Sequence, residues 1–386
     1  MPNHSPMRGI SIERFGEGRD KIALFLKSSW GDTLTSPGLL EAISRKCQAQ
    51  VLLFDIDDPA FRNPGNSWPT PEDAALLDAS RKKYHLAILE TIRAEGVGRC
   101  LFLGSLHFWE SGFLEELKKT AAVGSYLGDD DVASVAERIA KPYVRNYDVA
   151  FCACATYKDG QPMEDVYRTW GAPRARFLPL GLRPSKFDVS TADDAKRDID
   201  VIYVGGVYIK KVWRVLLVKW YFGKRMRLYG RGWNRSVSPA KTFILKALKF
   251  ALGVGHVEEL PESEFVATYR RAKIGFNIHQ EYGPTNYRLY ELPGNGVMQV
   301  CDNPDGLARV FAPGTEIVGY RNPIDAIIII RKYLKDDEAR RAIAAAGRER
   351  CLRDYRTEDM FALAAEELRR TLREKTSAQH NPTKHG

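Results

Sequence analysis

The chain has 386 residues, of which 44% are hydrophobic, 28% charged and 11% aromatic, and it carries a formal net charge of +9. This length exceeds one usual hydrophobic core and suits two domains, while the composition excludes overall disorder. The longest purely aliphatic run, 326–330, is too short to span a bilayer, and residues 1–20 have no apolar core of a secretory signal. We therefore expect a cytoplasmic protein, or one attached peripherally to the inner face of a membrane.

Strand and helix patterns alternate through the first half of the chain. Strands are predicted at 21–26, 50–54, 99–103, 122–126, 149–154 and 175–179. Helices are predicted at 36–47, 72–95, 113–120, 132–139 and 163–170. Strands that alternate with helices at this spacing predict a parallel sheet covered on both faces. The polar residues 183–197 then form a linker. The six cysteines are scattered, as is typical of a reducing compartment.

A second alternating series follows the linker. Strands are predicted at 200–204, 226–229, 274–279 and 297–300. Helical patterns cover the stretch up to 221, the amphipathic residues 238–252, 262–271, a short segment before Gly294, 323–333 and 337–375. The two halves therefore share an architecture.

The segment 274–311 organises the second half. Thr285 or Asn286 can cap a helix that carries Arg288 and Glu291, whose three-residue spacing places both side chains on one face. In open α/β sheets, ligands bind beyond the carboxyl ends of the strands, where helix amino termini favour phosphate. Glu291 could then accept both hydroxyls of a ribose, with Arg288 as a permanent charge. The alternative is an ordinary intrahelical pair on a solvated face.

The basic charge is local. Residues 208–250 contain twelve lysines and arginines and no acidic residue. This predicts a patch that faces anionic lipid head groups, another polyanion or a phosphorylated ligand. Residues 238–252 could lie in a lipid interface, or they could form an amphipathic core helix. Because no nucleic-acid recognition module is visible, we expect no nucleic-acid partner.

With these residues in view, the sequence resembles the group 1 glycosyltransferases of GT-B fold, in particular their CgeB-like branch. The motifs that carry the resemblance are DVIYVGG, LYGRGW, NYRLYE, GNGVMQVCD and AAAGRERCLRDY, with looser matches at YLGDDD and RFLPLGLRPSKF. The resemblance implies an α/β fold of two Rossmann-like domains with mostly parallel sheets facing a cleft. We expect an amino-terminal, acceptor-side domain at 1–185 and a nucleotide-sugar-binding domain at 186–356. A helix at 357–375 could pack back on the first domain, and 376–386 is expected to be a disordered tail.

The resemblance also implies residue roles. Gly205 and Gly206 would approach the diphosphate of the donor, Arg288 would meet its charge, and Glu291 would hold the ribose. Many group 1 transferases carry a second glutamate eight positions earlier, but Gly283 stands there in this chain. GT-B enzymes do not generally need a metal, so none is expected.

Further candidate residues lie at predicted strand ends. His279 and Asn286 are placed with the nucleotide, where a neutral imidazole could donate to a leaving phosphate. His107 and Asp130 join Arg288 as catalytic candidates, the histidine as a base for the acceptor hydroxyl. For both, a structural role is the alternative, as a hydrogen-bonded histidine or as part of an acidic group at a helix amino terminus.

The leading hypothesis is therefore a metal-independent glycosyltransferase of hexosyltransferase type in polysaccharide biosynthesis. It would move a sugar from a nucleoside diphosphate sugar to a hydroxyl of a glycan or related acceptor, without a cofactor. One alternative is a nucleotide-sugar epimerase or sugar phosphorylase on the same fold. The other is a catalytically inactive protein that binds an anionic membrane or polymer through residues 208–250.

Overall fold

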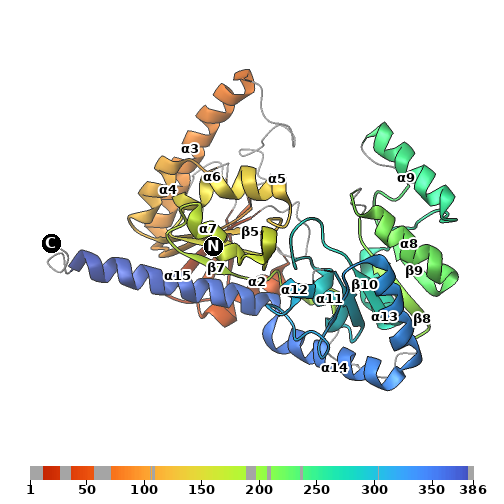
Figure 1. Ribbon diagram of the computed structural model, residues 1–386. Helices are drawn as coiled ribbons and strands as arrows, with labels where there is room; N and C mark the ends of the chain where they lie inside the picture. Colours follow the sequence, from red (N-terminus) through yellow and green to blue (C-terminus); the bar gives the residue numbers. More distant parts are fainter. Residues whose placement is uncertain are drawn as a thin grey trace. The chain divides into compact units, whose positions relative to one another are not determined.

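The computed structural model describes residues 12–26, 36–55, 71–104, 106, 109–187, 197–206, 210–234, 238–302 and 304–380. The chain divides into two compact units (Figure 1). The first unit comprises Met1–Ala153, Met163–Leu178 and Glu358–Gly386, and the second comprises Cys154–Pro162 and Pro179–Thr357. No helix among the described residues is both long and apolar enough to cross a bilayer.

The first unit is built on a seven-stranded sheet in the order β1-β3-β2-β4-β5-β6-β7. Its strands are β1 (Ile12–Phe15), β2 (Lys21–Leu26), β3 (Gln50–Asp55), β4 (Arg99–Leu103), β5 (Ala122–Leu127), β6 (Val149–Cys152) and β7 (Ala175–Phe177). All neighbouring strands run parallel except β1, which pairs antiparallel with β3. The predicted parallel sheet is therefore present, with one additional edge strand.

Helices connect these strands. They are α2 (Pro37–Cys47), α3 (Pro71–Glu95), α4 (Ser111–Lys118), α5 (Ala133–Val135), α6 (Lys141–Tyr143), α7 (Met163–Thr169) and α15 (Thr357–His380). The last helix runs on to His380, beyond the end at 375 that the sequence pattern predicts. Residues 381–386 of the predicted tail lie outside the described residues.

Helix α15, near the carboxyl end of the chain, packs on the first unit although the residues before it belong to the second unit (Figure 1). Buried Arg99, at the start of β4, donates to the carbonyl of Ala365 at 3.3 Å and pairs with Asp20 at 2.7 Å. Near the other end, Lys375 Nζ lies 2.6 Å from a carboxylate oxygen of Asp148. The carboxyl-terminal helix is thus fastened to the amino-terminal sheet by charged groups at both ends.

The second unit is built on a five-stranded sheet in the order β12-β11-β10-β8-β9, and its neighbouring strands are all parallel. The strands are β8 (Ile199–Val204), β9 (Met226–Tyr229), β10 (Ala272–Asn277), β11 (Met298–Cys301) and β12 (Val318–Gly319). The helices are α8 (Val212–Phe222), α9 (Pro239–Ala251), α10 (Phe265–Arg270), α11 (Arg288–Gly294), α12 (Pro304–Leu307), α13 (Pro323–Lys335) and α14 (Asp337–Asp354). Because β9 extends the sheet on one side of β8 and β10 on the other, the order reverses between β8 and β10, where such sheets bind ligands.

Alternate residues of β8 explain why this sheet is covered on both faces. Val201 and Tyr203 join a buried cluster with residues of α8 and α13, whereas Ile202 and Val204 join a second cluster with Leu292 of α11. Successive strand residues point to opposite faces, so an uninterrupted apolar strand needs helices on both sides. This packing holds α8 and α11 on opposite faces, close to the same strand ends.

Leucines on α15 test how far the first unit depends on this helix. Leu368 is fully buried and would lie 3.1 Å from a Cβ added at Gly124 of β5, whereas Leu363 on the same helix is 57% exposed. We expect Leu368→Ala to lower the free energy of unfolding by about 2 to 5 kcal/mol, because the cavity adds to the lost burial. Leu363→Ala should change it by less than about 0.5 kcal/mol. Urea denaturation followed by circular dichroism measures both, and equal losses would contradict this packing.

Candidate functional site

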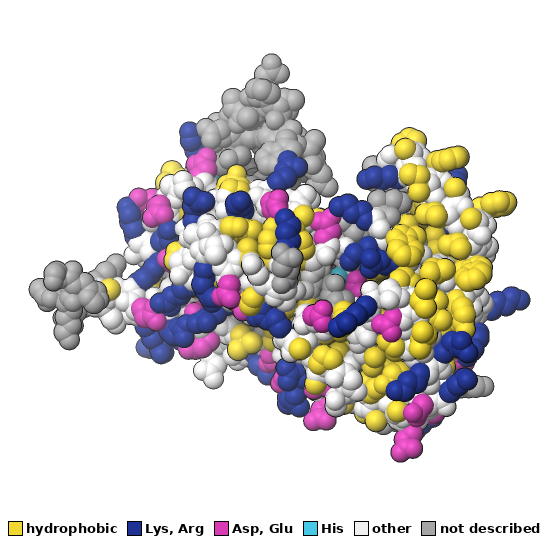
Figure 2. All heavy atoms as spheres, viewed as in Figure 1, with side chains coloured by type: hydrophobic (Ala, Val, Ile, Leu, Met, Phe, Trp, Pro, Cys, Tyr) yellow, Lys and Arg dark blue, Asp and Glu magenta, His cyan; other side chains and the backbone are white. Residues whose placement is uncertain are grey.

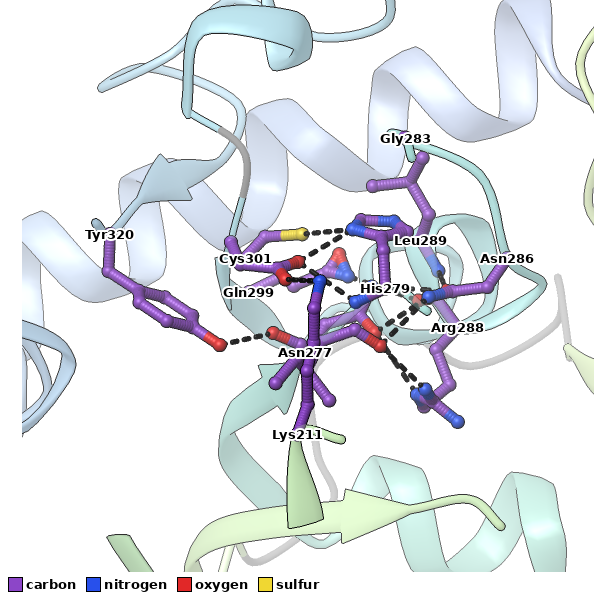
Figure 3. Close-up of polar contacts among 12 residues, drawn as sticks. Lys211, Asn277, His279, Gly283, Asn286, Arg288, Leu289, Gln299, Cys301 and Tyr320 are labelled. Carbon is purple, nitrogen blue, oxygen red and sulfur yellow. Dashed lines mark hydrogen bonds and ion pairs between the residues drawn. The ribbon is translucent and has the colours of Figure 1, made fainter. Parts of the chain in front are cut away.

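Polar side chains gather at the carboxyl ends of β8, β10 and β11, where the strand order of the second sheet reverses (Figure 3). They come from the ends of these strands and from the loop and helix that follow β10. Gly205, His279, Asn286 and Arg288, which the sequence assigned to a nucleotide site, all lie in this region.

Arg288, the first residue of α11, forms hydrogen bonds at the ends of two neighbouring strands, and Figure 3 shows it beside Asn277. Its guanidinium donates to the carbonyls of Val204 (2.9 Å) and Ile278 (3.1 Å) and to Asn277 Oδ1 (3.1 Å). It also lies over the ring of Tyr203, 4.8 Å from the ring centre. A guanidinium has five N–H groups, so these three bonds leave two available. Arg288 is therefore fixed in position by the protein and can still donate to an anion.

Asn277 and Asn286 form a reciprocal amide pair beside this arginine. Each amide nitrogen donates to the oxygen of the other side chain, at 3.1 and 3.0 Å. Asn286 Oδ1 also accepts the amide of Leu289 at 3.0 Å, in the first turn of α11. Asn286 thus caps the start of this helix and joins it to the end of β10, which satisfies its polar atoms within the chain. Its proposed contact with a nucleotide stays a prediction.

Gly205 follows β8 and is half-buried. Its amide donates to the carbonyl of Tyr229 at 2.9 Å, and its carbonyl accepts the indole N–H of Trp233 at 2.8 Å. A Cβ added at Gly205 would lie 1.9 Å from an Arg288 nitrogen. Close packing against the arginine therefore accounts for this glycine, and its amide is already used. The neighbouring Gly206 is exposed and remains accessible from outside.

His279, Cys301 and Asp302 form a buried polar cluster at the ends of β10 and β11. His279 donates its backbone amide (2.9 Å) and directs ring Nδ1 (2.7 Å) to Oδ1 of Asp302. Lys211, just before α8, places Nζ 3.4 Å from the other carboxylate oxygen, and Cys301 Sγ lies 3.8 Å from the same ring nitrogen. Burial raises the pKa of the Asp302 carboxyl, but the combined effect of His279 and Lys211 in the opposite direction is larger. The pKa is therefore lowered overall, and the carboxyl stays ionised.

The second ring nitrogen of His279 is the atom of this cluster to consider as a metal or ligand contact. Nε2 is buried, and it has no hydrogen-bond partner in the part of the chain that the structure describes. Ligand atoms of His279, Cys301 and Asp302 also lie within 4.8 Å of one another, as a metal site requires. However, the carboxylate already accepts two N–H groups and faces the charge of Lys211. The geometry therefore suits a histidine hydrogen-bonded to a carboxylate better than a bound metal cation.

Glu291 is also buried, with 2% of its surface exposed, one turn into α11. Arg183 donates to its Oε1 through Nε at 2.8 Å and through a second nitrogen. The same guanidinium lies over the ring of Tyr287, 4.1 Å from the ring centre. Burial lowers the pKa of Arg183, but the charge of Glu291 raises it by more, so the pKa is raised overall. The interpretation of Glu291 and Arg288 as a solvated intrahelical pair is therefore wrong, because each has its own buried partners.

Asp130, a further candidate, lies outside this cluster. Asp130 belongs to the first unit, is fully buried, and accepts the amide of Ala153 at 3.1 Å and the hydroxyl of Tyr167 at 3.0 Å. These contacts indicate a structural carboxylate, and its catalytic role stays a prediction. His107 lies outside the described residues.

Sequence reasoning missed several residues of the site, namely Arg183, Tyr203, Lys211, Asn277 and Asp302. Lys211 was counted only as one member of the basic stretch, and Arg183 as part of a polar linker. For Asn277 and Asp302 a signal existed, because each ends or directly follows a predicted buried strand at the edge where ligands bind. Nothing in the local sequence indicates that Arg183 meets Glu291.

Residues 213–366 match the model of a protein family described as glycosyl transferase-like. Sucrose-phosphate synthase from Thermosynechococcus elongatus is 16% identical with a TM-score of 0.63, over 92% of this chain and 100% of that one. A glycosyltransferase from Rickettsia africae is 11% identical with a TM-score of 0.60, over 92% and 98%. Anabaena HepE, solved with UDP and glucose, is 11% identical with a TM-score of 0.58, over 90% and 99%. No curated protein matches the chain in sequence.

These likenesses confirm the predicted fold class, an α/β protein with two Rossmann-like domains and mostly parallel sheets, of GT-B type. The matched family segment begins in α8 and ends in α15. It therefore contains α11 with Arg288 and Glu291, and the buried cluster around Asp302.

The lowered pKa of Asp302 predicts how stability responds to acid. Because the folded state holds this carboxylate ionised, its contribution is full above about pH 4, the unfolded pKa, and is lost as pH falls through the lower folded pKa. Asp302→Asn should cost about 3 kcal/mol near neutral pH.

The difference from wild type should shrink as the pH falls below about 4, the ordinary pKa of an aspartate. Urea denaturation at several pH values measures this difference. Asp305→Asn is the matched control, because that exposed carboxylate pairs only at the surface with Arg321, and it should change stability little at any pH. A cost of Asp302→Asn that did not vary with pH would contradict the ionised pair.

Proposed function

We propose that this protein transfers a sugar from a nucleoside diphosphate sugar to an acceptor hydroxyl. The buried carboxylate of Glu291 carries the proposal. It stands one turn into a helix that starts at the ligand-binding edge of the second sheet, within the segment that matches a glycosyl transferase-like family. A buried carboxylate in this position can accept two adjacent hydroxyls, as a ribose presents them. The solved complex of HepE with UDP and glucose supports a uridine nucleotide as the first donor to test.

The diphosphate of the donor would lie beside Gly206 and Lys211. Lys211 immediately precedes α8, whose amino terminus offers unpaired N–H groups and a positive dipole. Its ammonium keeps donors to spare beyond the 3.4 Å contact with Asp302. Arg288 would add its two remaining N–H groups from the opposite side of the β8 end. Gly205 acts indirectly, by letting Arg288 approach the backbone.

In the reaction, the acceptor oxygen forms a bond to the anomeric carbon while the bond from that carbon to the diphosphate oxygen breaks. Charge develops on the departing diphosphate, and fixed cations stabilise it without reorganising during the step. Arg288 and Lys211 suit this role because the protein already orients both. His279 would act indirectly, by holding the Asp302 carboxylate that faces Lys211. The acceptor proton would go to a base, for which His107 stays our candidate.

The finer features of the hypothesis are proposals of the same kind. The enzyme would be a hexosyltransferase of the CgeB-like branch that needs neither a metal nor a cofactor. Its acceptor would be a glycan or glycoconjugate in polysaccharide biosynthesis, on the inner face of a membrane. Chelation by EDTA tests the metal requirement, since activity should not change.

Two substitutions on the two sides of one ion pair test the donor site. Glu291→Gln removes the proposed ribose ligand, and Arg183→Gln breaks the same pair but leaves the carboxylate. Both substitutions should destabilise the protein, because each leaves the other member of the buried ion pair without an oppositely charged partner. Only Glu291→Gln should weaken nucleotide binding, by about 10- to 100-fold for two lost hydrogen bonds to a charged group. Arg183→Gln should retain binding, because the ribose no longer competes with Arg183.

Isothermal titration calorimetry with UDP, other nucleoside diphosphates and their sugars measures these affinities on folded protein. Equal loss in both variants would show that the pair is structural and would remove Glu291 from the donor site. Release of nucleoside diphosphate that requires a saccharide acceptor supports transfer. Turnover without an acceptor, or with inorganic phosphate alone, would favour the epimerase or phosphorylase instead. An absence of nucleotide binding would overturn the proposal.

A further inference from the structure

One face of the second unit carries many exposed apolar side chains. Figure 2 shows hydrophobic side chains gathered over the region of α8, α9 and α13. The exposed large hydrophobic residues on these helices are Trp213, Trp220, Tyr221, Phe243, Ile244, Phe250, Ile324 and Ile328. We call this set the apolar face. Soluble monomers rarely expose large contiguous apolar patches without a binding role.

Helix α9 has two apolar sides, which distinguishes it from an ordinary amphipathic core helix. Leu245 is fully buried, and Leu248 and Leu252 pack against the core of the unit. On the other side, Phe243 is 76% exposed and Phe250, seven residues later, is 90% exposed. Residues seven apart lie on one face of a helix. The outer stripe is therefore not needed to attach the helix to the protein.

Cations without acidic partners surround the apolar face. Some basic residues of the stretch 208–250 are paired with acids, for example Arg225 with Asp200 and Lys210 with Glu281. Lys241 and Lys246 on α9, and Lys224 and Arg227 near the end of α8, have no acidic partner in the part of the chain that the structure describes. Exposed aromatic residues bordered by unpaired cations are typical of surfaces that enter the head-group region of an anionic membrane.

A cavity of about 370 Å³ opens beside these cations. Its walls come from the end of α8, from β9 and from the loop after α9, and they include Lys219, Trp220, Lys224, Arg227, His256 and Glu258. Lys219 donates to the carbonyls of Gly223 and Met226, both at 2.7 Å. Burial, and then the nearby charge of Arg227, lower the pKa of Lys219. Like charges held this close, with one exposed acid on the wall, form a site that an anion would stabilise.

We propose that this cavity binds the phosphorylated head group of an anionic phospholipid while the apolar face enters the boundary of the acyl chains. The size, the cations and the aromatic border of the cavity all fit a phosphodiester at a membrane surface. Trp220 lines the cavity and is also part of the apolar face. A head group in the cavity would therefore lie next to the acyl chains that contact the apolar face. The site is separate from the nucleotide site and does not rest on the proposed function.

The charges argue against the other occupants of such a face. A second copy of this chain would bring the unpaired lysines and arginines of two faces together, and like charges repel. A nucleic acid would use the cations, but it would leave Phe243, Ile244 and Phe250 in water or against phosphates. An anionic bilayer offers partners to both kinds of side chain at once.

Vesicle co-sedimentation at about 0.1 M salt tests the proposal. Wild type should bind vesicles of phosphatidylcholine with phosphatidylglycerol and should not bind phosphatidylcholine alone. The double variant Lys224→Gln, Arg227→Gln should bind the anionic vesicles at least about tenfold more weakly, because each cation near the surface contributes. The double variant Phe243→Ser, Phe250→Ser should weaken binding similarly by removing inserted rings. Leu86→Ser with Leu363→Ser is the matched control, since both leucines are 57% exposed but belong to the first unit.

Each outcome decides between occupants. Binding to anionic vesicles that both test variants lose and the control retains supports the proposal, and higher salt should weaken it. Equal binding to neutral vesicles would overturn the head-group site, as would unchanged binding of the Lys224 and Arg227 variant. Absence of vesicle binding in wild type would overturn the whole proposal, and a dimer that the phenylalanine variant dissociates would then identify a second copy as the occupant. Nucleotide affinity, measured in parallel, should be unchanged in every variant and reports on the donor site independently.

Discussion

The guanidinium of Arg288 is the contact on which the second unit's site depends. Parallel strands β8 and β10 are neighbours in the sheet, and their carboxyl ends lie side by side. Arg288 donates to the carbonyl of Val204 at the end of β8 and to the carbonyl of Ile278 after β10, so one side chain links the two strand ends by hydrogen bonds. Glycine at 205 is required by this approach, since an added Cβ would lie 1.9 Å from the guanidinium. The charge is therefore placed before any ligand arrives.

Fixed charges also make the strand ends of the second sheet different from the rest of α11. Lys211 and Arg288 bring positive charge to the strand ends, and Asp302 with His279 balances part of it in the interior. Glu291, one turn into α11, is paired with a different cation, Arg183. A negative group at the strand ends would thus meet positive charge, while a hydroxyl-bearing group further along α11 would meet a carboxylate. This order matches the phosphates and ribose of a nucleotide.

Much of this architecture was predictable from sequence, because buried parallel strands read as continuous apolar runs such as DVIYV before Gly205. Strand β1 escaped prediction because Ile12–Phe15 is an edge strand with mostly exposed residues, so its sequence lacks that signal. The partners within the site were harder to predict. Arg183 and Glu291 are 108 residues apart, and only the folded chain brings them together. Local spacing also allowed Arg288 as the partner of Glu291, but in the structure each residue has its own partners from distant parts of the chain.

Helix α8 links the two sites proposed for the second unit. Lys211 at its beginning faces Asp302 and the nucleotide edge, while Lys219 and Trp220 near its other end line the cavity at the apolar face. At 1.5 Å per residue, a helix of this length sets the two sites roughly 15 Å apart. The helix is packed along its inner side through Val212, Val215 and Leu216, so this distance is fixed by the fold. A lipid head group bound at one end of α8 would therefore lie at a fixed distance from the proposed nucleotide edge, so membrane binding would keep that edge close to acceptors attached to the same membrane.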